Sequence, residues 1–182
     1  VIVLALMPVF LLVGTAIKLD SPGPVFFRQA RVGFRNRVFT VYKFRTMISS
    51  HTTIVDRHAA ITQENDPRIT RVGRILRKFR VDEFPQLINV IKGDMGLIGP
   101  RPEALSLSKW YEAEIPFYHY RHIIKPGITG WAQVSQGHVS DITDVSQKLH
   151  LDFYYVKNFS FWLDVLIMLK TVKVIVKGIG AK

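Results

Sequence analysis

Asp82 and Glu83 form a pair of adjacent carboxylates within residues 68–92, where every other charged side chain is basic. Pro85 follows them, and proline is accepted in the first turn of a helix but is costly in its interior. The segment FPQLINVIKG therefore predicts a helix that begins at the carboxylate pair and ends near Gly93. The pair then lies at a helix N-terminus, where the helix dipole and the free N–H groups favour ionised carboxylates.

Helix capping explains one acid of this pair better than it explains two, because a single carboxylate is enough for a cap. Arg77 and Arg80 precede the pair and also favour its ionised form. Ionised carboxylates among arginines suit two kinds of chemistry, a Mg²⁺ site formed by Asp82 and Glu83 or nucleophilic attack on phosphorus. The residue pattern leaves both open.

Three further cations are candidates for binding phosphate groups. Lys43 and Arg45 lie two residues apart in a predicted strand, where alternation puts both on one face, so that they can clamp a diphosphate. A solvated strand face is the other interpretation. Arg101 lies between Pro100 and Pro102, and a guanidinium on a stiff backbone suits bidentate contact with phosphate oxygens. The alternative here is a structured turn with a solvated arginine.

Several familiar motifs are incomplete in this sequence. Gly93, Gly96 and Gly99 recur at intervals of three, which matches neither the dinucleotide-binding nor the P-loop spacing. His119 and His122 are three residues apart, but the chain has no H-E-x-x-H segment and no cysteine to complete a zinc site. The sequence therefore gives little support to either of these nucleotide-binding motifs or to a zinc site.

The charge balance points to an anionic partner. The 182-residue chain carries a formal net charge of +11, which suits nucleic acid, anionic lipid or a phosphorylated small molecule. Because 48% of the residues are also hydrophobic, apolar and basic residues must be segregated into different segments, which favours a membrane surface. No recognisable nucleic-acid-binding element accompanies the arginines, so nucleic acid is not an expected partner. The length fits one domain.

The N-terminal segment Val1–Ile17 carries no charge and would form a helix of roughly 25 Å, somewhat shorter than a hydrocarbon core of about 30 Å. Pro8 near its middle predicts a kink, so we expect a re-entrant membrane helix over residues 1–20 that enters and leaves one leaflet. A buried core helix is the alternative. Basic residues after this segment place residues 21–182 on the cytoplasmic side.

Two later segments predict amphipathic helices at a membrane interface. DPRITRVGRILRKFR, residues 66–80, has an apolar stripe at helical spacing with arginines around it. Residues 158–178 are more apolar, with Trp162 near their start and lysines at intervals of three and four. The alternative for the first is a helix packed on the core with its arginines in water. The alternative for the second is a mostly buried terminal helix with a lysine edge.

The remaining patterns complete the expected fold. VFFRQARVGFRNRVFTVYKFRTM predicts two short strands around residues 33–37. Together with the helical segments, this predicts an α+β, mainly helical fold. We expect a small cytosolic domain with an N-terminal kinked re-entrant membrane helix and amphipathic interfacial helices.

Five segments, in order and spread over nearly the whole chain, carry a resemblance to a known family. They are SPGPVFFRQARVG, YKFRTM, DPRITRVGRILRKFRVDEFPQLINVIKGDMGLIGPRPE, KPGITGWAQV and FYYVKNFSFWLDVLIMLKTV. The chain resembles the bacterial sugar transferase family, the monotopic polyprenyl-phosphate phosphoglycosyl transferases. The likeness weakens after GWAQV, where His138 stands in place of an expected basic residue.

The resemblance implies an activity and a location. It implies transfer of a hexose-1-phosphate from a UDP-sugar to undecaprenyl phosphate with release of UMP, the first membrane step of polysaccharide or glycan synthesis. The expected location is the inner (cytoplasmic) membrane, with the catalytic domain, residues 21–182, on the cytoplasmic face and in contact with membrane lipid. Mg²⁺ is the expected cofactor. A non-catalytic basic module that binds anionic membrane lipid is the alternative function. The sugar and the oligomeric state, a homo-oligomer included, are left open.

The resemblance also implies residue roles. Asp82 is then the nucleophile that attacks the β-phosphorus and forms an aspartyl-phosphosugar intermediate, and Glu83 binds Mg²⁺ or deprotonates the acceptor phosphate. The family positions associated with phosphate handling are matched by Lys43, Arg45, Arg77 and Arg101. The kink of the family's re-entrant helix corresponds to Pro8.

Overall fold

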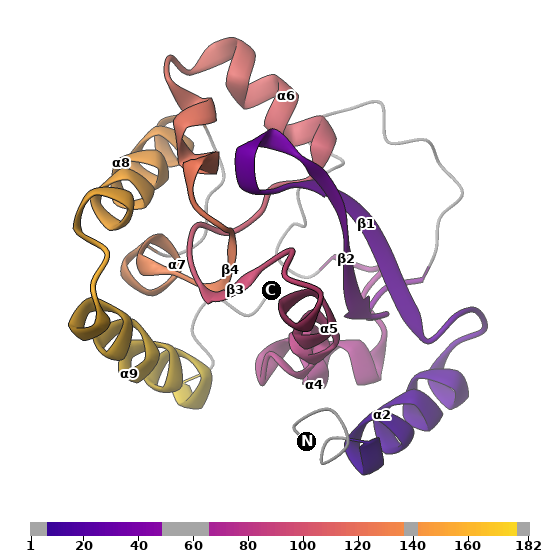
Figure 1. Cartoon of the computed structure of the whole chain (residues 1–182). Coiled ribbons are helices and arrows are strands. Elements are labelled where there is room, and N and C mark those ends of the chain that lie inside the picture. The colour runs from indigo at the N-terminus through magenta and orange to yellow at the C-terminus, as the bar shows by residue number, and fades with distance from the viewer. Residues whose placement is uncertain (1–6, 49–65, 137–141, 178–182) are drawn as a thin grey trace.

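The computed structural model describes residues 7–48, 66–136 and 142–177. The fold is α+β and mainly helical, as predicted, with helices around two small two-stranded sheets (Figure 1). The α-helices are α2 (Met7–Asp20), α4 (Arg71–Lys78), α5 (Leu87–Ile91), α6 (Leu105–Glu114), α7 (Trp131–Ser135), α8 (Ile142–Asn158) and α9 (Phe161–Lys177). The 3-10 helices are η1 (Phe34–Asn36), η2 (Val81–Gln86) and η3 (Tyr118–Ile123). The strands are β1 (Phe26–Val32), β2 (Val38–Phe44), β3 (Gly96–Ile98) and β4 (Gly127–Thr129).

β1 and β2 form an antiparallel hairpin that pairs Phe26 with Phe44 at one end and Val32 with Val38 at the other. The prediction of two strands around residues 33–37 is therefore confirmed. The β2 strand lies against η2, the helical turn that contains the two adjacent carboxylates. The hairpin thus brings the end of β2 to the carboxylate pair.

β3 and β4 form a short parallel pair near the middle of the molecule (Figure 1). Gly99 follows β3, and a Cβ there would lie 2.4 Å from the Lys125 carbonyl oxygen, so the close approach of the two chains requires glycine. Pairing continues beyond the strand, because the Gly127 N–H donates to the Pro100 carbonyl at 3.0 Å. The loop that carries Arg101 therefore lies beside β4, which leads directly into α7.

Two hydrophobic clusters form the core. One joins α2 to β2 and α4, and its buried members are Val13, Ile17, Phe44 and Leu76. The other joins α6, η3 and α8, and its buried members are Tyr111, Ile115, Tyr118, Val145 and Leu149. The N-terminal helix is thus anchored in the same core that supports the strand leading to the carboxylate pair.

The α2 helix has two sides of different character. Val13 and Ile17 are buried, whereas the opposite side exposes large apolar side chains, namely Leu11, Leu12 and Leu19. Pro8 is the second residue of the described part of α2. The predicted kink at Pro8 also involves residues 1–6, which lie outside the described residues. Within the described ranges, no helix is long and apolar enough to cross a membrane.

The segment predicted as the first amphipathic helix forms α4. The Thr70 hydroxyl caps it by accepting a hydrogen bond from the Gly73 N–H at 2.9 Å. Its apolar stripe is divided between core and solvent. Leu76 is buried in the core cluster, whereas Ile75 and Phe79 are 60% and 48% exposed. Part of the stripe therefore packs on the core, and the rest faces outward beside the arginines.

The second predicted amphipathic helix forms α9 and is largely uncovered. Ile167 is buried, but many large apolar side chains are exposed: Phe161, Trp162, Leu166, Met168, Leu169, Val172 and Val176. The alternative of a mostly buried terminal helix is therefore wrong for α9. The Lys170 ammonium lies 4.4 Å from the centre of the Trp131 ring, which fixes one side of α9 against α7.

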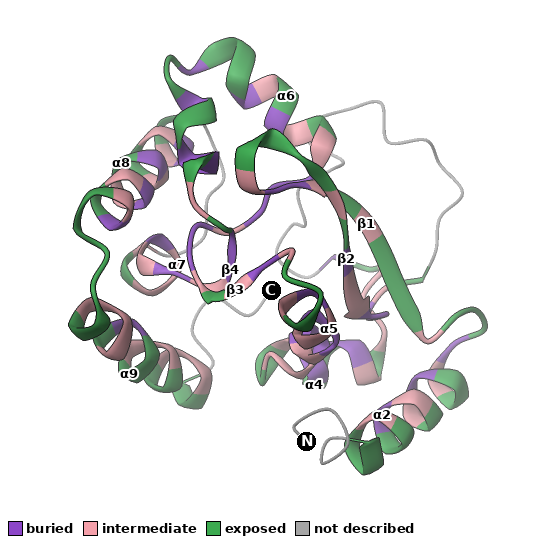
Figure 2. Ribbon diagram, in the orientation of Figure 1, coloured by how far each residue is buried: buried purple, intermediate pink, exposed green. Residues whose placement is uncertain are grey.

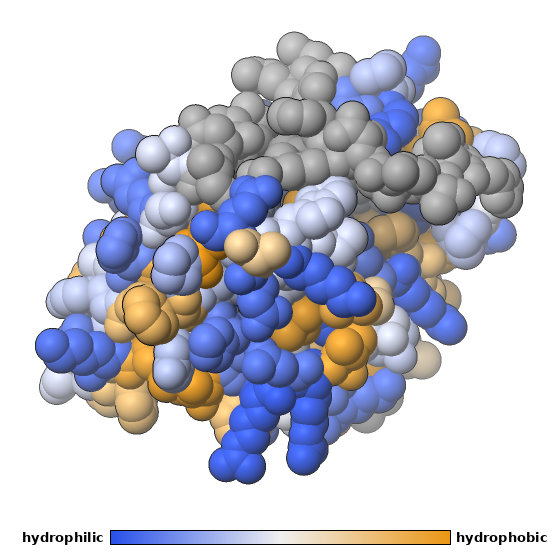
Figure 3. All heavy atoms as spheres, turned by 90° about the horizontal axis from the view of Figure 1, so that it is seen from above, coloured by the Kyte–Doolittle hydropathy of each residue, from blue (hydrophilic) through white to orange (hydrophobic). Residues whose placement is uncertain are grey.

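The exposed apolar helices gather on one side of the molecule. Figure 1 shows α2, α4 and α9 along its lower edge, with the β1–β2 turn near the top. Figure 2 shows extensive exposed surface on α2 and α9 in the same orientation. From above, in Figure 3, hydrophilic residues predominate in the described part of the upper face, with smaller hydrophobic patches between them. The side that carries α2, α4 and α9 is therefore the candidate for contact with an apolar environment.

Candidate active site

Asp82 and Glu83 lie in the first turn of η2 and are only 8% and 6% exposed. The predicted helix start near this pair is confirmed, although the first turn is a 3-10 helix rather than an α-helix. Pro85 has no N–H to donate to the preceding turn, which explains why regular α-helical bonding begins only after it. The helical run ends at α5, and Gly93 adopts a positive φ of 81° close behind, as expected of a helix stop.

Glu83 is held by two cations that come from distant parts of the chain. Its Oε1 accepts hydrogen bonds from Lys43 Nζ at 2.8 Å and from Arg101 Nη2 at 2.6 Å. Its Oε2 also accepts from Arg101 Nη1, at 3.4 Å. Burial alone would raise the pKa of Glu83, but Arg101 and Lys43 outweigh burial and hold this pKa well below its usual range. Glu83 is therefore ionised and paired.

Asp82 has a different environment from its neighbour. Its Oδ1 is buried and has no hydrogen-bond partner among the described residues. Burial raises the pKa of Asp82; Lys43 opposes this effect, and the nearby charge of Glu83 adds to it. The sequence predicted that the helix N-terminus and the arginines would favour ionisation of both acids, and for Asp82 burial works against them. The result is a poorly solvated carboxylate with one uncommitted oxygen.

The two cations that hold Glu83 are themselves largely shielded from solvent. The Lys43 and Arg101 side chains are 16% and 25% exposed. Burial lowers the pKa of Lys43 to about 8 despite the opposing charge of Glu83. The charge of Glu83 raises the pKa of Arg101 above its ordinary value. Two of the predicted phosphate-binding residues are thus brought together at the carboxylate pair.

Arg77 and Arg45, the other two predicted phosphate-binding residues, differ in whether they lie near the carboxylate pair. The Arg77 Nε donates to the Thr46 hydroxyl at 2.8 Å, and the charge of Asp82 acts on its pKa against burial, so Arg77 lies within electrostatic reach of Asp82. Arg45 instead donates to backbone carbonyls at the end of α2: Ile17, Ser21 and Pro22. β2 ends at Phe44, so strand alternation does not extend to Arg45. The predicted clamp of Lys43 with Arg45 is therefore not assembled.

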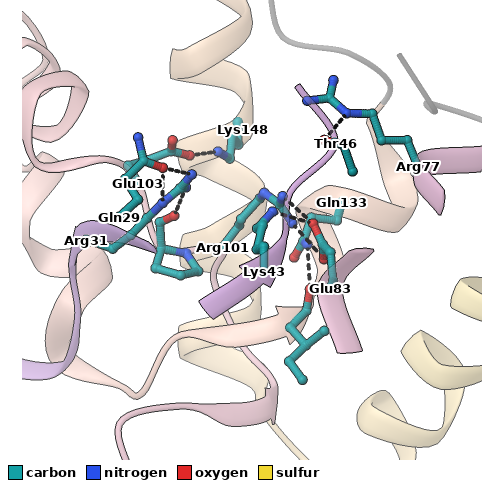
Figure 4. A network of polar contacts seen from close by, with 12 residues as sticks. Gln29, Arg31, Lys43, Thr46, Arg77, Glu83, Arg101, Glu103, Gln133 and Lys148 are labelled. Carbon is teal, nitrogen blue, oxygen red and sulfur yellow. Dashed lines mark hydrogen bonds and ion pairs between the residues drawn. The ribbon is translucent and has the colours of Figure 1, made fainter. Parts of the chain in front are cut away.

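Side chains behind Arg101 hold its loop in place, and Figure 4 shows one of them, Arg31. The Arg121 guanidinium donates to the Arg101 carbonyl at 2.8 Å and forms an ion pair with Asp152 at 2.7 Å. Arg31 donates to the next loop carbonyl, that of Pro102. Sequence reasoning missed these residues, because each contact joins segments that are far apart in the chain and no local spacing marks them. The position of Arg101 therefore depends on contacts from β1, η3 and α8 as well as on its own loop.

The KPGITGWAQV segment contributes a residue that the sequence did not single out. Lys125 in this segment is exposed, and Trp131 packs against Lys170. Figure 4 instead shows Gln133 among the residues around Glu83 and Arg101. In the sequence Gln133 is a single glutamine in a Gly-rich turn, and such a residue cannot be told apart from one with only a structural role.

The structure offers limited options for a metal. The described ranges contain no group of three or more His, Cys, Asp or Glu side chains arranged to hold a metal ion. Asp82 Oδ1 is a buried oxygen with no hydrogen-bond partner in the described part of the chain, whereas the oxygens of Glu83 are engaged by cations. Of the two predicted metal ligands, only Asp82 presents a free oxygen of the kind that Mg²⁺ prefers.

His119 and His122 line a hollow of about 330 Å³ between η1 and η3, which contains neither acid of the pair. Burial and the adjacent Arg121 lower the pKa of His122 to about 4, so its imidazole is neutral. This hollow has no carboxylate in its lining and is not a candidate for phosphate chemistry. His138 lies outside the described residues.

Known proteins resemble this chain over nearly its whole length. The sequence model of the family described as bacterial sugar transferase matches residues 1–178. UDP-N-acetylgalactosamine-undecaprenyl-phosphate N-acetylgalactosaminephosphotransferase of Aeromonas hydrophila is 53% identical over 96% of this chain and 41% of its own length. UDP-glucose:undecaprenyl-phosphate glucose-1-phosphate transferase of Escherichia coli (strain K12) is 40% identical over 94% of this chain and 37% of its own length.

A shorter relative is covered more fully. Exopolysaccharide production protein PSS of Rhizobium leguminosarum bv. phaseoli is 45% identical over 93% of this chain and 86% of its own length. The chain thus spans less than half of the Aeromonas hydrophila and Escherichia coli proteins and most of the Rhizobium leguminosarum protein. The region matched by the family model, residues 1–178, spans the carboxylate pair and the cations around it.

Proposed function

The chain belongs to the bacterial sugar transferase family, and on this premise we propose that it transfers a hexose-1-phosphate from a UDP-sugar to undecaprenyl phosphate and releases UMP. The names of its relatives supply the reaction class. The observation that carries the proposal is the buried Asp82–Glu83 pair, with Glu83 held between Lys43 and Arg101. A module that only binds lipid has no need of buried ionised groups, which are costly to desolvate.

Asp82 is the nucleophile in this proposal. One of its oxygens attacks the β-phosphorus of the UDP-sugar and forms a P–O bond, while the bond from that phosphorus to the bridging oxygen breaks. UMP leaves with the bridging oxygen and its electron pair, and the sugar phosphate remains on Asp82 as an acyl phosphate. The buried Oδ1 without a hydrogen-bond partner supports this role, because attack by this oxygen sacrifices no existing hydrogen bond.

The lipid phosphate completes the reaction. One of its oxygens attacks the same phosphorus, the bond to Asp82 breaks, and the carboxylate is regenerated as undecaprenyl diphosphate-sugar forms. Both substrates are anions, so the positive charge of Lys43, Arg77 and Arg101 lowers their repulsion from the site and from each other. Dividing the transfer into two displacements lets the soluble donor and the lipid acceptor react in turn at one carboxylate.

Glu83 has a separate part in this proposal. Because Glu83 accepts hydrogen bonds from Lys43 and Arg101, it holds both cations in position before a substrate binds. When the donor diphosphate binds, its oxygens compete for the same N–H groups, and Glu83 is then released to accept the proton of the acceptor phosphate. Glu83 therefore positions the cations before the donor binds and accepts a proton from the acceptor phosphate afterwards.

A divalent metal would be held by Asp82 through the carboxylate oxygen that does not attack, because the oxygens of Glu83 are engaged by Lys43 and Arg101. Glu83 becomes a second ligand only where its ion pairs open. Mg²⁺ bound beside the donor diphosphate would neutralise negative charge on the departing UMP.

We also propose that α2, α4 and α9 hold the domain on the cytoplasmic face of the inner membrane. These helices expose large apolar side chains, and all three run along one side of the molecule (Figure 1). Basic residues accompany the apolar ones on α4 and α9, as in helices that lie in a membrane interface with cations at the headgroups. In this arrangement α2 is the re-entrant element, with Leu11 and Leu12 directed into one leaflet.

A panel of UDP-sugars tests the proposed reaction. The protein, in lipid bilayer discs with undecaprenyl phosphate and Mg²⁺, is mixed with UDP-glucose, UDP-galactose or either N-acetylated counterpart, and UMP is measured. At least one donor should release UMP and yield lipid-linked sugar. The lipid-binding alternative predicts vesicle binding without turnover of any donor, and that outcome would overturn the proposal.

A further inference from the structure

Gln133 lies in the first turns of α7, next to the loop that carries Arg101. The Gly99 N–H donates to the Thr129 carbonyl at 2.9 Å, so the chain entering that loop runs beside the end of β4. α7 starts directly afterwards, and a Cβ on Gly130 would lie 2.2 Å from the Gly99 carbonyl oxygen. This close packing puts the start of α7 against the Arg101 loop, as Figure 4 shows for the side chain of Gln133.

The amide of Gln133 has a defined orientation with one group unused. Its Nε2 donates to the Ile128 carbonyl at 2.9 Å, so the other amide atom must be the oxygen, because two acceptors would repel each other. That oxygen, Oε1, is buried and has no hydrogen-bond partner among the described residues. A buried acceptor without a partner is unfavourable, and such groups in folded proteins usually have a ligand, water or ion to satisfy them.

The missing partner must be a hydrogen-bond donor, and this requirement selects between the substrates. Ionised phosphate oxygens only accept, and undecaprenyl phosphate has no polar group besides its phosphate. The UDP-sugar carries hydroxyl and N–H donors on its sugar and its nucleoside. Since the sugar is attached to the phosphorus that Asp82 attacks, it is the part of the donor that must lie beside the carboxylate pair and Arg101.

We infer that Gln133 is a binding residue for the sugar of the nucleotide donor, with Oε1 accepting a hydrogen bond from a sugar hydroxyl or N-acetyl N–H. This inference rests on the proposed function and adds a specificity residue to it. The Ile128 carbonyl fixes the amide so that Oε1 remains an acceptor, and a sugar with no donor at the matching position leaves it unsatisfied. Gln133 therefore distinguishes sugars by the position of one donor group.

The chain provides a matched control in Gln136. Its Oε1 is also buried and has no partner within residues 7–48, 66–136 and 142–177, but its Nε2 donates to the Asp144 carbonyl at 3.0 Å, so this amide faces the α8 side of the fold. If activity falls merely because a glutamine has been removed from this region, substitutions at Gln133 and at Gln136 should both lower it. A loss caused by a sugar contact would appear only at Gln133.

The test compares kcat/KM for the best UDP-sugar with the inhibition constant of UDP, which lacks the sugar. Gln133→Ala should lower kcat/KM about threefold to tenfold, the effect of one lost hydrogen bond, and leave the UDP inhibition constant within about twofold. Gln136→Ala should change neither quantity. Gln133→Met, which keeps the side-chain length but has no amide acceptor, should repeat the Gln133→Ala result and serves where the alanine variant does not fold.

Each other outcome counts against the inference. An unchanged kcat/KM in both Gln133 variants, or an equal weakening of UDP and UDP-sugar, would overturn the sugar contact. A changed Mg²⁺ requirement with an unchanged ratio between sugars would assign Oε1 to the metal instead and overturn it too. Wild-type protein that turns over no UDP-sugar would contradict the proposed function, which separates that failure from a failure at Gln133.

Discussion

Asp82 and Glu83 are adjacent in the chain and both buried, yet the fold shifts their pKa values in opposite directions. Burial raises the pKa of Asp82, whereas Arg101 and Lys43 outweigh burial at Glu83 and hold its pKa well below the usual range. Two carboxylates whose environments differ in this way are suited to different roles. Glu83 keeps the cations in position, and Asp82 keeps an oxygen free to react.

Glu83→Gln should destabilise the fold. The amide still accepts a hydrogen bond, but Lys43 and Arg101 then lose the carboxylate that accepts hydrogen bonds from both of them. Breaking a buried ion pair costs about 3–5 kcal/mol, and partial exposure of both cations reduces this to about 2–3 kcal/mol. For a chain of this size the melting temperature should fall by roughly 4–12 °C, measured by circular dichroism.

Glu112→Gln is the matched control for this change, because Glu112 lies on the exposed side of α6. Its free energy of unfolding should stay within about 0.5 kcal/mol of the wild-type value. Equal melting temperatures for Glu83→Gln and wild type would show that the Lys43–Glu83–Arg101 arrangement adds nothing to stability.

The pH profile of kcat/KM for the UDP-sugar should be bell-shaped. Asp82 reacts as the ionised form, and burial raises its pKa above the ordinary value of 3.8, so activity should rise with pH through a value above 3.8. Lys43 acts as an ammonium, and burial lowers its pKa to about 8, so activity should fall as the pH rises through about 8.

Lys43→Arg tests the assignment of the basic side of this profile. A guanidinium stays protonated far above pH 8, so the residual activity of this variant should lose its decline near pH 8. A decline that stays at the same pH in Lys43→Arg would mean that another group is responsible.

Arg45→Met should act mainly on α2. The carbonyls of Ile17, Ser21 and Pro22 lose their guanidinium partner, so we expect faster backbone hydrogen exchange over residues 17–23 and a melting temperature several degrees lower. Arg28→Met, on the exposed part of β1, should change neither measurement. If Arg45→Met instead leaves exchange unchanged and weakens UDP binding, Arg45 contacts phosphate, as the family resemblance implies.

Replacing two aromatic residues at the start of α9 should weaken membrane binding. Phe161 and Trp162 are 73% and 77% exposed, and moving such side chains from water to lipid is worth about 1.5–3 kcal/mol each. The double change Phe161→Ser and Trp162→Ser should reduce binding to anionic vesicles at least about tenfold in a flotation assay. Val38→Ser, near the β1–β2 turn, is the control and should bind as wild type does. If the double variant floats with the vesicles as wild type does, α9 is not part of the membrane interface.

Local patterns in the sequence were enough to predict the elements with the clearest periodicity or turn chemistry. The hairpin around residues 33–37, the helical run through Pro85, and helices α4 and α9 each depend on periodicity or turn chemistry within one segment. The same information made Lys43 and Arg101 candidates for phosphate binding, although it could not show that both contact Glu83. These contacts with Glu83 connect β2, η2 and the loop after β3, which only the folded chain brings together.

The parts that escaped prediction depend on tertiary packing. Arg121 and Asp152 pair across 31 positions, and no local spacing marks either residue. Arg45 was expected beside Lys43, but β2 ends one residue earlier and the side chain turns to α2. The raised pKa of Asp82 arises from burial, which opposes the helix N-terminus that the sequence does reveal.

Covalent capture tests the nucleophile assignment most directly. The protein is mixed with UDP-sugar labelled in the β-phosphate, without undecaprenyl phosphate, and the intact protein and its peptides are analysed by mass spectrometry while UMP is counted. Wild type should release UMP in an amount equal to the sugar phosphate found on the peptide that contains Asp82, and Asp82→Asn should take up none. UMP release that requires the lipid acceptor and leaves the protein unlabelled, or a label on a residue other than Asp82, would contradict it.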